Sequence, residues 1–149
     1  MRASLFLCAG LLAALAVGIA GCGKAKLDTP EACLKAFDAA MRRGDIAKAT
    51  QLVALDKWAA DNATDWNSYA PSQRDLILGR MREEFGQKLE AIRQTYLQAN
   101  YQAGAAQIQG EWATLPLTGG GSALPVILYF NGNEWRIYSL GDLRVGMGE

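Results

Sequence analysis

The spacing of apolar residues changes from a helical to a strand-like period after Ala99, and this change limits the fold more than any other feature. Before it, apolar side chains recur every three or four positions from Leu78 to Tyr96, which predicts a long amphipathic helix opening at Ser72. After it, residues 106–112 alternate between apolar and polar, which predicts a half-exposed strand. Helices followed by consecutive strands indicate the α+β class.

Two shorter helices are predicted ahead of the long one. Thr29-Pro30-Glu31 combines a capping residue, a proline suited to the first helical position and an acidic first turn. Gly44 then marks the helix end, and Asp45 caps the second helix. Residues 56–60 extend this helical pattern, and residues 61–72 are rich in turn formers and predict a loop.

The remaining strands are separated by two turn signals. The glycine-rich run 119–122 leads into a strand over residues 124–130, and Asn131-Gly132 predicts a two-residue hairpin turn into residues 133–140. Such a turn sets Leu128 opposite Trp135 on one face of the sheet. We therefore expect N-terminal helices packed on a curved antiparallel sheet of three to four strands.

The first 21 residues have the layout of a secretory signal. Arg2 precedes an apolar run over residues 5–17, and small residues lead to a cysteine in Ile19-Ala20-Gly21-Cys22. The run is shorter than the roughly 20 apolar residues that span a bilayer. An ordinary secretory signal and a retained anchor are the two alternatives. The four residues around the cut resemble the lipobox of bacterial lipoproteins, with cleavage between Gly21 and Cys22.

The lipobox resemblance implies where in the cell the chain is located. Cys22 becomes the lipidated first residue, carrying a diacylglyceryl thioether and an N-acyl group. Gly23 stands where an Asp would favour the inner membrane, so the resemblance implies an outer-membrane anchor facing the periplasm. Residues 22–28 form a tether of about 25 Å at most. A domain over residues 29–140 and a tail over residues 141–149 follow.

A second resemblance concerns the mature domain. Thr29-Pro30-Glu31, Phe37, Gly44-Asp45, Ala49 and residues 129–137 are similar to the nuclear-transport-factor-2-like (cystatin-like) cone fold. Within that fold they look like small bacterial lipoproteins of unknown function. The resemblance implies a pocket enclosed between helices and sheet, such as those that hold small apolar ligands.

Composition argues against most kinds of chemistry. The chain has no histidine, and its 15 basic residues balance 15 acidic ones, so it lacks the commonest base and metal ligand and the charge that nucleic acids require. No metal or cofactor is expected. Asp38, Asp56 and Glu111 are nominees for a carboxylate base, but nothing in their spacing marks them. Cys33 is expected to be a small buried side chain.

Aromatic side chains supply the remaining candidates. Around a pocket we expect Phe85, Trp112, Tyr129, Trp135 and Tyr138, although ordinary core packing also explains them. Trp58, Trp66 and Tyr69 lie in the loop-like segment and are expected to contact a protein if they are exposed. The sequence thus predicts a non-catalytic, lipid-anchored binding or scaffolding domain. An envelope interaction or immunity factor and a small cone-fold enzyme are the alternatives.

Overall fold

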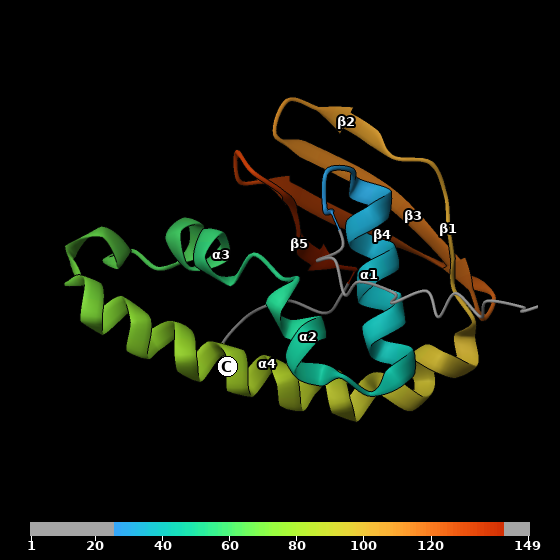
Figure 1. Ribbon diagram of the computed structural model, residues 1–149, viewed down its shortest axis with the longest axis horizontal. Coiled ribbons are helices and arrows are strands. Elements are labelled where there is room, and N and C mark those ends of the chain that lie inside the picture. Colours follow the sequence, from blue (N-terminus) through green and yellow to red (C-terminus); the bar gives the residue numbers. More distant parts are fainter. Residues whose placement is uncertain (1–25, 142–149) are drawn as a thin grey trace, which may run out of the picture.

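The computed structural model describes residues 26–141, which form one antiparallel sheet with helices packed against it (Figure 1). The helices are α1 (Pro30–Arg43), α2 (Ile46–Gln51), α3 (Leu55–Asn62), the short 3-10 helix η1 (Trp66–Ser68) and α4 (Pro71–Ala99). The strands are β1 (Gln102–Ala103), β2 (Gln107–Gln109), β3 (Trp112–Gly119), β4 (Ser122–Phe130) and β5 (Trp135–Leu140).

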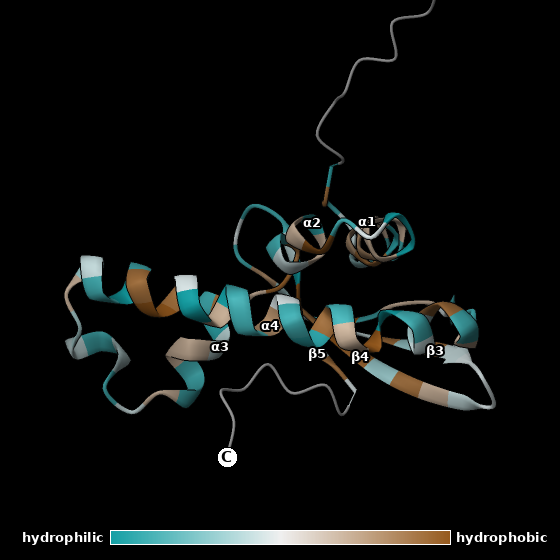
Figure 2. Ribbon diagram, turned by 90° about the horizontal axis from the view of Figure 1, so that it is seen from below, coloured by the Kyte–Doolittle hydropathy of each residue, from teal (hydrophilic) through white to brown (hydrophobic). Residues whose placement is uncertain are grey.

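The predicted α+β class is confirmed, with five strands in place of the three to four expected. Figure 2 shows α1 and α2 together on one side of the strands, with α4 running lengthwise beside them. Among the described residues, no helix combines the length and the apolar character needed to cross a bilayer. The signal, Cys22 and the tail beyond Gly141 lie outside the described residues.

The caps predicted for the first two helices are confirmed. The Thr29 hydroxyl accepts a hydrogen bond from the Ala32 N–H at 3.1 Å, and the Asp45 carboxylate accepts one from the Lys48 N–H at 3.0 Å. Gly44 ends α1 with a φ of 73°, a left-handed conformation that glycine adopts without a steric penalty. These short-range hydrogen bonds fix where the chain reverses between α1 and α2.

The segment between α2 and α4 is more ordered than predicted. Residues 55–62 form a separate helix rather than an extension of α2, and η1 interrupts the predicted loop. The long helix begins at Pro71, not Ser72, because the Gln73 side chain accepts a hydrogen bond from the Ala70 N–H at 3.0 Å. A proline at the first helical position needs no N–H partner there.

The single strand predicted over residues 106–112 is wrong. The chain reverses at Gly110-Glu111, so Gln109 pairs with Trp112 across a two-residue turn. Gly110 has a φ of 61°, which a hairpin turn with glycine at its first position requires. Both β1 and β2 therefore pair with the same edge of β3, and the sheet continues through β4 to β5.

The register predicted for the last hairpin is also wrong. Phe130 pairs with Trp135 across a four-residue loop, which places Leu128 opposite Ile137. The Asn131 carboxamide oxygen accepts hydrogen bonds from the N–H groups of Asn133 and Glu134, at 3.0 and 2.9 Å, and so widens the turn. A shift of two residues preserves the face of each side chain, so Leu128 and Trp135 are both buried as expected.

The free edge of β5 is covered by segments from the N-terminal half of the chain. The Trp135 N–H donates to the Leu27 carbonyl at 2.9 Å, and the Ile137 N–H donates to the Leu52 carbonyl at 2.8 Å. Ala54 completes the contact by donating its N–H to the Ile137 carbonyl, also at 2.8 Å. Such pairing removes an exposed strand edge and ties residues 27 and 52–54 to the sheet.

Two glycines offer a matched test of this packing. Gly119→Ala would bring a methyl group within 2.5 Å of the Ala99 carbonyl oxygen, whereas Gly79→Ala adds one with nothing within 4 Å. We expect Gly119→Ala to lower the free energy of unfolding by about 1–3 kcal/mol and Gly79→Ala to raise it by about 0.5–1 kcal/mol. Urea unfolding measures both, and equal effects would contradict the close approach of β3 to the end of α4.

Candidate functional site

An apolar pocket of about 250 Å³ lies between the C-terminal half of α4 and the helix-covered face of the sheet. It is lined by Phe37, Ile92, Thr95, Tyr96, Tyr101, Leu117, Leu124, Val126 and Leu140. The pocket thus draws on α1, α4 and three strands, and it lies slightly below the range of about 300–1,000 Å³ typical of drug-sized ligands. It suits a small apolar molecule or the end of a longer one.

Aromatic contacts shape one wall of this pocket. The rings of Phe37 and Tyr96 meet edge to face with centroids 6.1 Å apart, and Tyr101 lies 5.4 Å from Tyr96. Phe37 is fully buried, and Tyr96 is 9% exposed. Because Tyr96 comes from the last turns of α4 and Phe37 from the middle of α1, the wall depends on how these two helices are docked.

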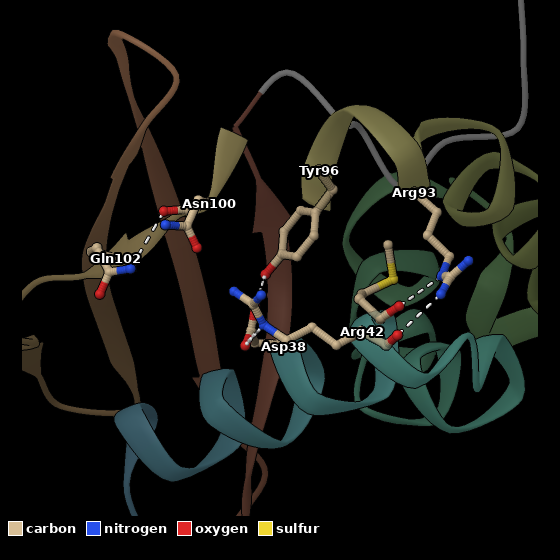
Figure 3. Close-up of polar contacts among 7 residues, drawn as sticks. Asp38, Arg42, Arg93, Tyr96, Asn100 and Gln102 are labelled. Carbon is tan, nitrogen blue, oxygen red and sulfur yellow. Dashed lines mark hydrogen bonds and ion pairs between the residues drawn. The ribbon is translucent and has the colours of Figure 1, made fainter. Parts of the chain in front are cut away.

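A polar network closes the outer end of the Tyr96 side chain (Figure 3). The Tyr96 hydroxyl donates to one Asp38 oxygen at 3.2 Å, and the Arg42 guanidinium donates to the other at 2.7 Å. Burial and the neighbouring Asp38 carboxylate raise the pKa of Tyr96. The tyrosine therefore remains a neutral donor, and its ring presents an apolar surface to the pocket.

Arg93 fixes α4 against the end of α1. Its guanidinium donates to the carbonyls of Met41 and Arg42 at 2.7 and 3.0 Å, as Figure 3 shows. The Met41 carbonyl also accepts the Gly44 N–H at 3.2 Å. A positive charge is favourable at a helix C-terminus. The contact sets the spacing of the two helices next to the pocket.

The three candidate carboxylate bases, Asp38, Asp56 and Glu111, are not placed for proton transfer in this pocket. Asp38 is half-buried and engaged by Tyr96 and Arg42, whereas Asp56 and Glu111 are exposed. No acidic side chain lines the pocket in the described part of the chain. Likewise, residues 26–141 contain no group of three or more side chains suited to hold a metal ion.

None of the five aromatic residues predicted for a pocket lines this one. Phe85 and Trp135 are core residues, 3% and 6% exposed. Trp112, Tyr129 and Tyr138 are half-buried and lie on the opposite face of the sheet, because successive strand residues alternate between faces. One pocket could not have received residues from both faces.

The three outward-facing rings instead hold α3 against the sheet. The Trp112 ring lies 5.0 Å from both Tyr129 and Tyr138, and the Lys57 ammonium lies 5.6 and 5.2 Å from the Trp112 and Tyr129 rings. Asp61 accepts hydrogen bonds from Lys57 at 2.7 Å and from the Tyr138 hydroxyl at 3.1 Å. The polar groups of Lys57, Asp61 and Tyr138 are therefore paired with one another.

The aromatic residues predicted for an interface are only partly accessible. Trp66 is 6% exposed and belongs to the core, so it does not offer the exposed surface that the prediction required. Trp58 and Tyr69 are half-buried and pack against the core. The turn formers around Trp66 suggested a loop, but η1 folds its indole inward.

The pocket residues that the sequence analysis missed carried a weak signal. Ile92 and Tyr96 belong to the recognised stripe of α4, yet nothing in the sequence marked Tyr101, Leu124 or Leu140 as pocket residues.

Comparison with known proteins finds no matching family model, no matching curated protein and no matching solved structure. The site is therefore interpreted from its own geometry.

The thiol of Cys33 gives a test of the core beside the site. Cys33 is fully buried, as expected, and burial raises its pKa from 9.0 to about 12. The folded protein then holds this proton more tightly than the unfolded chain, so its contribution to stability is lost as pH rises from 9.0 towards 12. Raising the pH from about 8 to 10.5 should therefore lower the free energy of unfolding less in Cys33→Ala than in the unsubstituted protein. Urea unfolding at both pH values checks this, and identical losses would contradict it.

Proposed function

We propose that this chain is a lipid-anchored, non-catalytic binding domain of a bacterial envelope, which holds a small apolar molecule between α4 and the sheet. The apolar pocket is the observation that carries the proposal. Its lining offers aliphatic and aromatic surface with few polar groups, which is typical of sites for apolar ligands. Among residues 26–141 no carboxylate lines this pocket, which favours binding over acid–base chemistry.

The anchor part of the proposal rests on the N-terminal sequence. Ile19-Ala20-Gly21-Cys22 resembles a lipobox, and Leu27 is already bound to β5, so little chain separates Cys22 from the folded domain. The domain would then work at the periplasmic face of its membrane, with the outer membrane favoured by Gly23. The cone-fold resemblance supports the same proposal, since it implies a pocket between helices and sheet.

Ligand binding can be tested with the apolar fluorophore N-phenyl-1-naphthylamine. We expect its fluorescence to rise on binding and to fall again when dodecanoate competes. Leu124→Trp should fill the pocket and weaken binding at least about tenfold, a loss of about 1.4 kcal/mol. Leu76→Trp, at a residue 61% exposed and outside the pocket, should leave binding unchanged. Equal affinity in both variants, each shown to be folded, would place the ligand elsewhere.

Lipidation can be tested in cells that express the full chain. We expect labelled palmitate to be incorporated and the protein to enter the detergent phase of a Triton X-114 separation. Cys22→Ala should abolish palmitate incorporation, because the thioether cannot form, whereas Cys33→Ala should not change it. Palmitate incorporation by Cys22→Ala would contradict the lipid anchor.

A further inference from the structure

A second, polar groove of about 540 Å³ follows residues 50–56, between α2, the first half of α4 and the start of β5. Its charged lining residues are Lys48, Asp56, Arg82, Glu134 and Arg136. It shares no lining residue with the apolar pocket. The groove is therefore a separate candidate site, and its chemistry is set by charge.

Arg136 has an unsatisfied donor beside this groove. Glu134 accepts a hydrogen bond and ion pair from one of its terminal nitrogens, but the buried Nε has no hydrogen-bond partner among the described residues. Leaving such a buried donor unpaired is unfavourable. Groups of this kind often mark the place of a water or an ion. The Arg136 side chain is 27% exposed, so part of it can be reached from the groove.

Two further cations line the groove. Lys48 and Arg82 are exposed, and neither makes an ion pair within residues 26–141. Glu134 is already paired with Arg136, which leaves Asp56 as the one acidic lining group without an ion pair there. Two free cations against one free carboxylate favour an anionic ligand, and guanidinium groups bind phosphate especially well.

The groove also lies next to Leu27, close to the N-terminal end of the described residues. Leu27 lines it, and the Leu27 carbonyl accepts the Trp135 N–H at 2.9 Å, which fixes this residue on the edge of β5. Cys22 is five residues earlier, a span of at most about 17 Å of extended chain. A lipid on Cys22 would thus keep the groove near phospholipid headgroups.

We propose that this groove binds a phosphate group, with Arg82, Arg136 and Lys48 as its donors, and that an anionic phospholipid beside the anchor supplies it. The membrane source rests on the lipid anchor proposed above, whereas phosphate binding itself does not. The three cations come from α2, α4 and β5, so they are far apart in the sequence. The fold alone brings them to one groove.

The first experiment measures inorganic phosphate binding without any lipid. The protein is the chain from residue 22 with Cys22→Ser, which contains the whole core found between Leu27 and Leu140. Titration followed by amide NMR shifts should give saturable binding. Arg82→Gln should weaken it at least about fivefold, because Arg82 lines the groove and makes no ion pair within residues 26–141. Arg80→Gln, on the same helix, also exposed and outside the groove, should leave it unchanged.

The second experiment identifies the source of the phosphate. The same protein is sedimented with phosphatidylglycerol vesicles or with phosphatidylcholine vesicles. Binding to the anionic vesicles that Arg82→Gln reduces and Arg80→Gln retains would support the headgroup. Phosphate binding without vesicle binding would overturn the membrane source while supporting the groove. Absence of phosphate binding, or equal effects of the two arginine variants, would overturn the proposal, whatever the fluorophore and palmitate results show.

Discussion

The burial of one side of α1 against the sheet and its neighbouring helices is the constraint on which the rest of the structure depends. Cys33, Phe37 and Met41 repeat along one side of this helix and are fully buried. A helix enclosed on that side must have its end groups satisfied as well, and Arg93 supplies donors to the last carbonyls. The same docking sets the position of Tyr96 relative to Phe37, and both residues line the apolar pocket.

The sheet has two faces with different roles. One face joins the core with α1, while the other carries the cluster of Trp112, Tyr129 and Tyr138, against which Lys57 and Asp61 hold α3. Cation–π contacts and a partly exposed ion pair contribute little each, about 0.5–1 kcal/mol. α3 is thus attached by several weak contacts, whereas residues 52–54 are attached by backbone pairing to β5.

The features predicted well from sequence are those that depend on nearby residues. The Thr29 cap, the Gly44 stop and the stripe of α4 each involve side chains within a few positions, so one sequence is enough to find them. The two turns that were predicted wrongly contain residues that fit more than one local structure. Gly110 fits an alternating strand as well as a turn, and Asn131 can favour a tight turn or accept two backbone N–H groups in a wider one.

The candidate sites could not be predicted in the same way. The pocket joins residues from α1 to β5, and the groove joins Lys48, Arg82 and Arg136, so both depend on long-range docking. The expected pocket combined Trp135 with Tyr138, although an odd spacing in a strand places them on opposite faces. Knowing that the faces alternate was sufficient to reject that grouping, even without the fold.

The polar groove and the apolar pocket lie along different parts of α4. Leu78 and Arg82 line the polar groove, whereas Ile92 and Tyr96 line the apolar pocket, a separation of roughly 20 Å along the helix at 1.5 Å per residue. A helix is stiff over that length, so a phosphate held at Arg82 would orient the pocket at a fixed distance from the headgroups rather than bring it into the bilayer. An apolar ligand would then have to cross the interfacial water or be delivered by a partner. The pocket's small volume favours the first route, since a small molecule crosses water more readily than a long acyl chain, which exposes more apolar surface.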